Sequence, residues 1–92
     1  MRIDKYLKVS RIIKRRTVAS EACSGGRVMI NGKIAKPASP VAMGDVIGIR
    51  FGEHTGYYRV VEIAETVSRD HAAEMYQVLE EDEYLSSERS KA

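Results

Sequence analysis

Residues 14–32 read KRRTVASEACSGGRVMING, and this stretch decides the fold because it joins a basic turn, a helix and a hairpin. Thr17 is a residue type that caps helix N-termini, and the glycine pair at residues 25–26 is typical of a helix end. The pattern therefore predicts a helix over residues 17–24. Its apolar side would consist of Val18, Ala19, Ala22 and Cys23, whose small volumes let a neighbouring helix approach closely.

A β-hairpin is predicted directly after this helix. Residues 28–30 (VMI) form a short apolar run that ends at Asn31-Gly32. This dipeptide strongly favours a two-residue type I′ turn, because both turn positions need a positive φ. Residues 33–35 would then return the chain as the second strand of the hairpin.

An amphipathic helix is predicted before the basic turn. Residues 2–9 (RIDKYLKV) place apolar side chains at positions i, i+3 and i+4 and basic side chains opposite them. The apolar side consists of Ile3, Tyr6 and Leu7, and the basic side consists of Arg2, Lys5 and Lys8. The two helices would meet through residues 10–16, which end in three consecutive basic residues.

The C-terminal half predicts two more strands and a last helix. Residues 46–51 and 57–63 show strand patterns and are separated by a glycine-flanked loop at residues 52–56. Ser68 or Asp70 would cap a helix that continues into the acidic block. The apolar side of that helix would consist of Ala72, Met75, Tyr76 and Leu79.

Together these elements predict an α+β fold with a single domain over residues 1–80. An N-terminal helix-turn-helix would pack on a small, mainly antiparallel β-sheet, followed by the C-terminal helix. We expect residues 81–92 to form an acidic, disordered tail. The length of 92 residues leaves room for one modest core and favours a binding module over an enzyme.

Charged residues divide unevenly along the chain, although the formal net charge is only +2. Residues 1–50 hold eleven Lys or Arg and three Asp or Glu, which is a formal charge of +8. Residues 51–92 hold four Lys or Arg and ten Asp or Glu, which is a formal charge of −6. A basic half on a small protein is typical of a polyanion binder, because each cation placed on a phosphate releases condensed counterions. RNA or DNA is therefore the favoured partner.

Membrane, secreted and catalytic classes are disfavoured. No apolar run approaches the roughly 20 residues that span a bilayer, and charges occupy the N-terminal stretch where a signal peptide is apolar. The single cysteine, Cys23, excludes an internal disulfide and suits a reducing compartment, so we expect a cytoplasmic protein. Cys23, His54 and His71 are too dispersed to form a catalytic or metal site. We therefore expect no enzymatic activity, no cofactor and no metal.

The candidate binding residues share a position at a helix start, in the inter-helix turn or in the first hairpin. They are Arg2, Lys5, Arg11, Lys14, Arg15, Arg16, Arg27, Lys33 and Lys36. They can converge on one RNA-binding surface, and the alternative interpretation is a set of unrelated solubilising charges. Asn31 is first a turn residue and second a candidate RNA contact. Asp4 favours the dipole of the first helix and can orient a neighbouring arginine.

These motifs resemble the S-four (S4) RNA-binding fold, named for a small-subunit ribosomal protein. The resemblance is carried by RxDKxL at residues 2–7, KRRTxA at 14–19, GRVxxNG at 26–32 and Gly44-Asp45. Over nearly the whole chain, to about residue 80, the sequence is similar to the stand-alone bacterial ribosome quality control P family. That similarity rests on RIDKYLKVSRIIKRRT, NGKIAKPAS, GDVIGIRFG and AAEMYQVL, and the acidic tail matches no shared pattern.

The resemblance implies an RNA-binding factor of bacterial ribosome-associated quality control. Such a factor binds rRNA and peptidyl-tRNA on obstructed large ribosomal subunits and works with a NEMF-like factor while alanine tails are added. The implied RNA surface comprises Arg2, Arg11, Lys14, Arg15, Arg16, Arg27, Asn31, Lys33 and Lys36.

Two other functions stay open. A general rRNA-binding chaperone or ribosome-assembly factor would need the same basic surface. A DNA-binding helix-turn-helix regulator is less favoured, because residues 17–24 offer few side chains that read base edges. No DNA or membrane partner is expected.

Overall fold

The first half of the chain folds in the predicted order of two helices and a hairpin. The structure is a computed structural model, and it describes residues 1–81. The elements are α1 (Ile3–Val9), α2 (Arg16–Ser24), β1 (Val28–Ile30), β2 (Lys33–Ile34), β3 (Val46–Phe51), β4 (His54–Val60), α3 (Arg69–Ala72) and β5 (Tyr76–Leu79). The chain is thus the predicted α+β fold.

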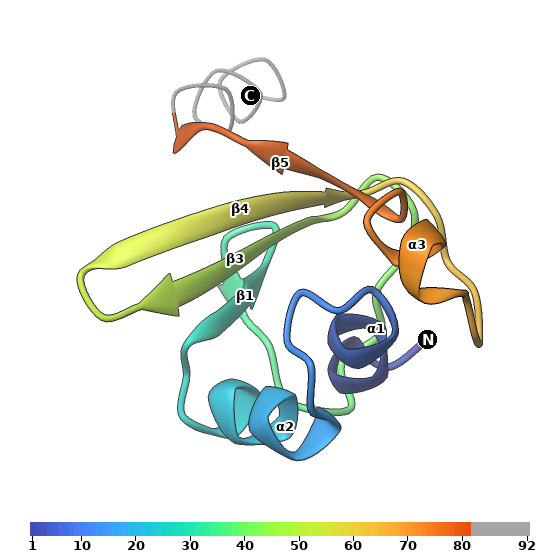
Figure 1. Ribbon diagram of the computed structural model, residues 1–92. Coiled ribbons are helices and arrows are strands. Elements are labelled where there is room, and N and C mark those ends of the chain that lie inside the picture. Colours follow the sequence, from blue (N-terminus) through green and yellow to red (C-terminus); the bar gives the residue numbers. More distant parts are fainter. Residues whose placement is uncertain (82–92) are drawn as a thin grey trace.

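All strands belong to one sheet with the order β2-β1-β3-β4-β5, and every neighbouring pair is antiparallel. Figure 1 shows α1 and α2 on the same side of this sheet, while the turn between β3 and β4 extends beyond them. The β1–β2 turn is the predicted one, because Asn31 and Gly32 have φ angles of 51° and 82°. The sheet therefore serves as the platform that carries the two N-terminal helices.

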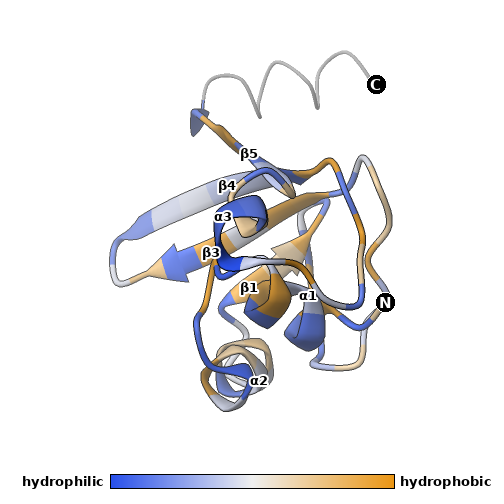
Figure 2. Ribbon diagram, turned by 45° about the vertical axis from the view of Figure 1, so that its right-hand side comes forward, coloured by the Kyte–Doolittle hydropathy of each residue, from blue (hydrophilic) through white to orange (hydrophobic). Residues whose placement is uncertain are grey.

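The core lies between α1, α2 and the facing side of the sheet. Ile3, Tyr6 and Leu7, the predicted apolar stripe of α1, are completely buried. Figure 2 shows hydrophobic residues concentrated on β1 and on the part of α1 beside it. The sheet contributes Val28, Ile47, Ile49 and Val60, and α2 contributes Ala19, Ala22 and Cys23. Because α1 is anchored on one side, its polar side remains outside the core.

Tyr6 connects α1 to the segment that leads into β5. Its hydroxyl donates a hydrogen bond of 2.9 Å to the backbone carbonyl of Met75, which is itself completely buried. Burial also raises the pKa of the Tyr6 phenol, so it stays protonated and acts as a donor. Within the described residues, no helix is long and apolar enough to cross a membrane.

The predicted start and apolar side of α2 need correction. The helix begins at Arg16, with Arg15 as its N-cap, so Thr17 is inside the helix instead of capping it. Arg15 makes no side-chain capping bond. Val18 is 45% exposed and does not pack between the helices, whereas Ala19, Ala22 and Cys23 are buried as expected. The smaller side chains let α2 lie close to the core without Val18.

The predicted loop at residues 52–56 is wrong, because β4 begins at His54 and pairs with Phe51. A tight turn at Gly52, with a φ of 62°, replaces the loop. Gly56 lies inside β4 for a steric reason, since a Cβ there would stand 2.8 Å from the Tyr58 hydroxyl. A glycine that indicated a loop is therefore a strand residue covered by a tyrosine ring.

The predicted C-terminal helix is correct only in its first turn. The side chain of Ser68 accepts a hydrogen bond from the backbone N–H of His71 and caps α3, as expected. The helix ends at Ala72, however, and residues 76–79 form β5 on the free edge of β4. The apolar residues 72, 75, 76 and 79 have helical spacing, but a single helical turn followed by a strand places them in the same way. Pairing with β4 makes residues 76–79 a strand instead of a continued helix. The predicted tail, apart from its first residue, lies outside the described residues.

Candidate nucleic-acid interface

The N-terminus of α1 is held by the segment that follows the hairpin. The backbone N–H of Ile3 donates to the carbonyl of Ser39 at 2.8 Å, and Val41 donates to Met1 at 2.9 Å. Arg2 is the N-cap of α1 and forms an isolated β-bridge with Pro40. The backbone of Arg2 is therefore anchored on both sides, which restricts where its side chain can reach.

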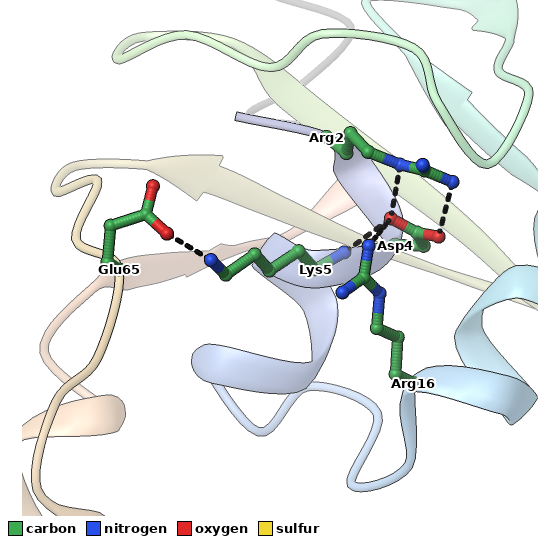
Figure 3. A network of polar contacts seen from close by, with 5 residues as sticks. All are labelled: Arg2, Asp4, Lys5, Arg16 and Glu65. Atoms are coloured by element: carbon green, nitrogen blue, oxygen red, sulfur yellow. Dashed lines mark hydrogen bonds and ion pairs between the residues drawn. The ribbon is translucent and has the colours of Figure 1, made fainter.

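Asp4 is the centre of a charged cluster at this point. Its side chain is only 4% exposed. Its carboxylate accepts hydrogen bonds from Arg2 Nε at 3.2 Å and Arg2 Nη2 at 3.1 Å, and a longer one of 3.5 Å from Arg16 Nη2. The backbone N–H of Lys5 donates to the same carboxylate at 2.7 Å (Figure 3). This confirms that Asp4 orients neighbouring arginines.

The cluster brings the starts of α1 and α2 together. Arg2 comes from the first helix and Arg16 from the second, and their side chains are 52% and 47% exposed. A guanidinium has five N–H donors, so on these half-exposed side chains the donors that Asp4 does not use are available to bind phosphate oxygens. We call Arg2, Asp4 and Arg16 the arginine cluster.

Lys5 lies on the same helix but faces a different partner. Its ammonium group forms an ion pair with Glu65, which lies between β4 and α3 (Figure 3). The hydrogen bond from Lys5 holds the pKa of the Glu65 carboxyl below its ordinary value. The structure therefore directs Lys5 toward the C-terminal half and away from the arginine cluster.

A small basic pocket of about 140 Å³ lies where α1 ends. Lys8, Arg11 and Lys14 line it together with Glu65, Thr66 and Val67. Lys8 was missed as a candidate site residue, although its spacing of three from both Lys5 and Arg11 places it on the basic side of α1. The pocket can accept an anion, because three cations line it against one carboxylate.

Arg11 adopts a backbone conformation that arginine rarely has. Its φ is 62°, in the left-handed region, directly after the C-cap Ser10. Its N–H donates to the carbonyl of Lys8, as in a helix-terminating turn where glycine is the usual residue. Backbone strain of this kind often lies at functional sites, and here it falls on an arginine that lines the basic pocket.

The predicted hairpin residues divide between structural and exposed positions. The Asn31 amide donates to Asp45 Oδ1 at 3.0 Å and accepts from the backbone N–H of Val46 at 3.0 Å. It therefore connects two turns within the fold. Lys33 is exposed on the edge strand β2, and Lys36 is exposed near the segment that holds α1. The hydrogen bonds and ion pairs of the arginine cluster described above involve neither of these lysines.

The other predicted arginines flank α2. Arg15 is its exposed N-cap, near the arginine cluster. Arg27 follows its C-terminus, and the carbonyl of Arg27 accepts a hydrogen bond of 2.9 Å from the N–H of Arg50. The structure thus brings Arg2 and Arg16 together on Asp4 and places Arg11 and Lys14 at the basic pocket, while Arg27 lies near the end of β3.

Cys23 is buried in α2, and this burial raises the pKa of its thiol, so it is a core residue. Among residues 1–81, no group of His, Cys, Asp and Glu is arranged to hold a metal ion.

The arrangement of two helices, a hairpin and a basic surface defines a class of protein. A family model described as the S4 domain matches residues 1–47, which contain α1, α2, β1, β2 and the start of β3. The Vibrio cholerae heat shock protein 15 has a similar structure, with a TM-score of 0.79, 28% identity and coverage of 98% of this chain and 91% of the other. These likenesses agree with the S4-like fold expected from the sequence.

Two curated relatives carry the name RQC P-site tRNA stabilizing factor. The Halalkalibacterium halodurans protein is 44% identical over 88 residues, covering 96% of this chain and all of the relative. The Bacillus subtilis protein is 48% identical over 82 residues, covering 89% of this chain and 95% of the relative. The chain belongs to the S4-domain family of the RQC P-site tRNA stabilizing factors.

Proposed function

We propose that this protein is an RNA-binding factor of ribosome-associated quality control that stabilises tRNA on obstructed large ribosomal subunits. One structural observation carries the proposal: Arg2 and Arg16, from two different helices, are oriented by one buried carboxylate and remain half exposed. The near full-length similarity to relatives named for stabilising P-site tRNA supports it.

The mechanism is binding without bond chemistry, in the cytoplasm. Folded RNA has a deep major groove that side chains cannot read, so a small module works through phosphates, 2′-hydroxyls and shape. The basic surface would contact large-subunit rRNA and the backbone of peptidyl-tRNA and hold the tRNA in a geometry usable for another elongation step. The protein would support alanine tailing of the stalled chain together with a NEMF-like factor. Residues 1–80 are the binding domain, followed by the acidic tail at 81–92.

Sedimentation of the tagged full-length chain from lysate tests this function. We expect it to migrate with large subunits that carry peptidyl-tRNA, and hardly with intact translating ribosomes. Migration mainly with immature subunits free of tRNA would instead indicate a general rRNA chaperone or assembly factor. Recovery of mainly genomic DNA, as for a helix-turn-helix regulator, or of free small subunits would contradict the proposal.

Salt dependence provides a second, independent measurement. About five neutralised phosphates would give a slope near −4 in a plot of log affinity against log salt concentration. A flat dependence would mean that the basic surface is not the contact surface.

A further inference from the structure

A second, mainly apolar pocket lies beside α2, separate from the basic pocket. It measures about 260 Å³. Ile12, Ile13 and Val18 line one side, Phe51 at the end of β3 lines another, and Arg27 and Arg50 also line it. We call this the Phe51 pocket. It is not explained by the arginine cluster, with which it shares no residue.

Phe51 and Val18 remain exposed although both are large and apolar. Phe51, the only phenylalanine of the chain, is 48% exposed, and Val18 is 45% exposed. Phe51 is the last residue of β3, directly before the β3–β4 turn, which extends past the helices (Figure 1). Neighbouring exposed apolar side chains that line a concavity are typical of a binding site.

The two arginines that line the Phe51 pocket favour a negatively charged ligand. Arg27 and Arg50 are adjacent, since the N–H of Arg50 bonds to the carbonyl of Arg27, and Arg50 Nε donates to the carbonyl of Gly52 at 3.1 Å. Among the described residues that line the pocket, none is acidic. An occupant with a flat apolar body and a negative charge matches this combination.

The volume of the Phe51 pocket and its place beside the inter-helix segment restrict the possible ligands further. The volume is below the roughly 300 to 1,000 Å³ of pockets for drug-sized ligands, so it suits one planar ring system. Ile12 and Ile13 belong to the same inter-helix segment as Lys14 and Arg15, so the pocket continues the basic surface. A nucleic acid on that surface would reach the pocket with a neighbouring nucleotide.

We propose that the Phe51 pocket binds one unstacked RNA base, with the ring of Phe51 against the base and Arg27 or Arg50 on its phosphate. The proposal rests on the RNA-binding function above and adds a base-binding subsite to it. Aromatic side chains hold single-stranded bases by stacking, and arginine adds a cation–π or phosphate contact.

The test is an NMR titration of the ¹⁵N-labelled full chain with adenosine 5′-monophosphate and, separately, ribose 5-phosphate. Both carry the same sugar and phosphate, but only the first has a base. We expect the nucleotide to shift the amide signals of Val18, Arg27 and Phe51, and ribose 5-phosphate to leave Val18 and Phe51 unchanged. Phe51→Ala should abolish the base-dependent shifts, while Phe51→Tyr should keep them.

Binding to large subunits separates this proposal from the proposed function. Phe51→Ala should weaken subunit binding by roughly 5- to 100-fold, and Val78→Ala, which trims another exposed apolar side chain on β5, should not. Unchanged melting temperatures would show that both variants fold. Wild-type affinity of Phe51→Ala, alongside loss of binding in Arg16→Ala, would overturn the base pocket and keep the proposed function. Weakened subunit binding without nucleotide shifts would also overturn it, because the contribution of Phe51 to subunit binding would then not come from a bound base.

Discussion

The arginine cluster and the ion pairs formed by Glu62 and Glu65 both rest on a carboxylate, but the surroundings of that carboxylate are opposite. The carboxylate of Asp4 is 4% exposed, whereas that of Glu65 is 75% exposed and that of Glu62 is 40% exposed. A buried anion has one fixed position and therefore orients the arginines around it. Exposed pairs move in solvent and contribute little to stability. The burial of Asp4 thus makes the arginine cluster a binding surface of fixed geometry, whereas the exposed pairs are ordinary solvated charges.

Loss of an arginine from the cluster should produce the largest effect. Arg16→Ala or Arg2→Ala should weaken large-subunit binding by about 10- to 150-fold, because a charged hydrogen-bonding set is worth about 1.5 to 3 kcal/mol. Sedimentation and alanine-tailing assays measure the loss. Arg69→Ala, an exposed arginine on α3, is the matched control. Equal losses from Arg69 and Arg16, or loss of the circular dichroism signal in Arg16→Ala, would restore a diffuse or structural role for the charge.

Replacing the buried Asp4 should affect RNA binding differently from replacing the exposed Glu65. Asp4→Asn keeps the shape but removes the charge that orients two guanidinium groups, at a stability cost of about 1 to 2 kcal/mol. Because the variant is also one charge more positive, binding to unrelated RNA should rise while binding to large subunits falls. The ratio of the two affinities, measured by filter binding, is the decisive quantity. Glu65→Gln is the control at an exposed acid, and a ratio changed equally in both variants would argue against positioning by Asp4.

Substitutions of Arg11 can distinguish its backbone strain from its contribution to large-subunit binding. Arg11→Gly relieves the left-handed strain but increases the freedom of the unfolded chain, so the fold should be about 0 to 1 kcal/mol more stable. Subunit binding should nevertheless fall several-fold through the lost charge. Thermal unfolding and sedimentation measure the two effects. Arg11→Asn, which tolerates the same φ, should behave similarly, and unchanged binding in both variants would leave the strain without a function.

The smallest effect is expected from the exposed pair of the C-terminal half. The hydrogen bond that His71 Nε2 donates to the Glu62 carboxylate, at 2.8 Å, raises the pKa of His71 above its ordinary value. A raised folded-state pKa contributes stability below the unfolded value of about 6.5 and loses it as pH rises through the folded value. His71→Gln should therefore lower the melting temperature at pH 5.5 and leave it unchanged at pH 9.

Binding to large subunits should not depend on either histidine of the chain. His71→Gln and the control His54→Gln should both bind large subunits like the wild type. A large loss of binding in either variant would contradict this and indicate a catalytic or metal site that includes the histidine.

Local patterns predicted the N-terminal half well. Asn31-Gly32 forms the expected turn, and the stripe of Ile3, Tyr6 and Leu7 is buried as expected. These features depend on spacing within one or two neighbouring elements. The assignment of RNA contacts to individual residues stays a prediction.

Features that depend on distant pairing were not predicted. β5 forms because β4 offers a free edge, and local spacing cannot reveal that edge. Lys5 pairs with Glu65, 60 residues away, so its diversion from the basic surface is invisible in the sequence of α1. The burial of Asp4 depends on the whole arrangement of α1, α2 and the segment at residues 37–41.

The hydrogen bond between Tyr6 and Met75 also sets the order of events during synthesis. The two residues are 69 positions apart, so the phenol of Tyr6 has no native partner until nearly the whole chain has left the exit tunnel. A buried donor without its acceptor costs about 1 to 3 kcal/mol. The packing of α1 against the segment before β5 is therefore completed only after residue 75 has emerged, although the bonds that form the arginine cluster lie within residues 2–16.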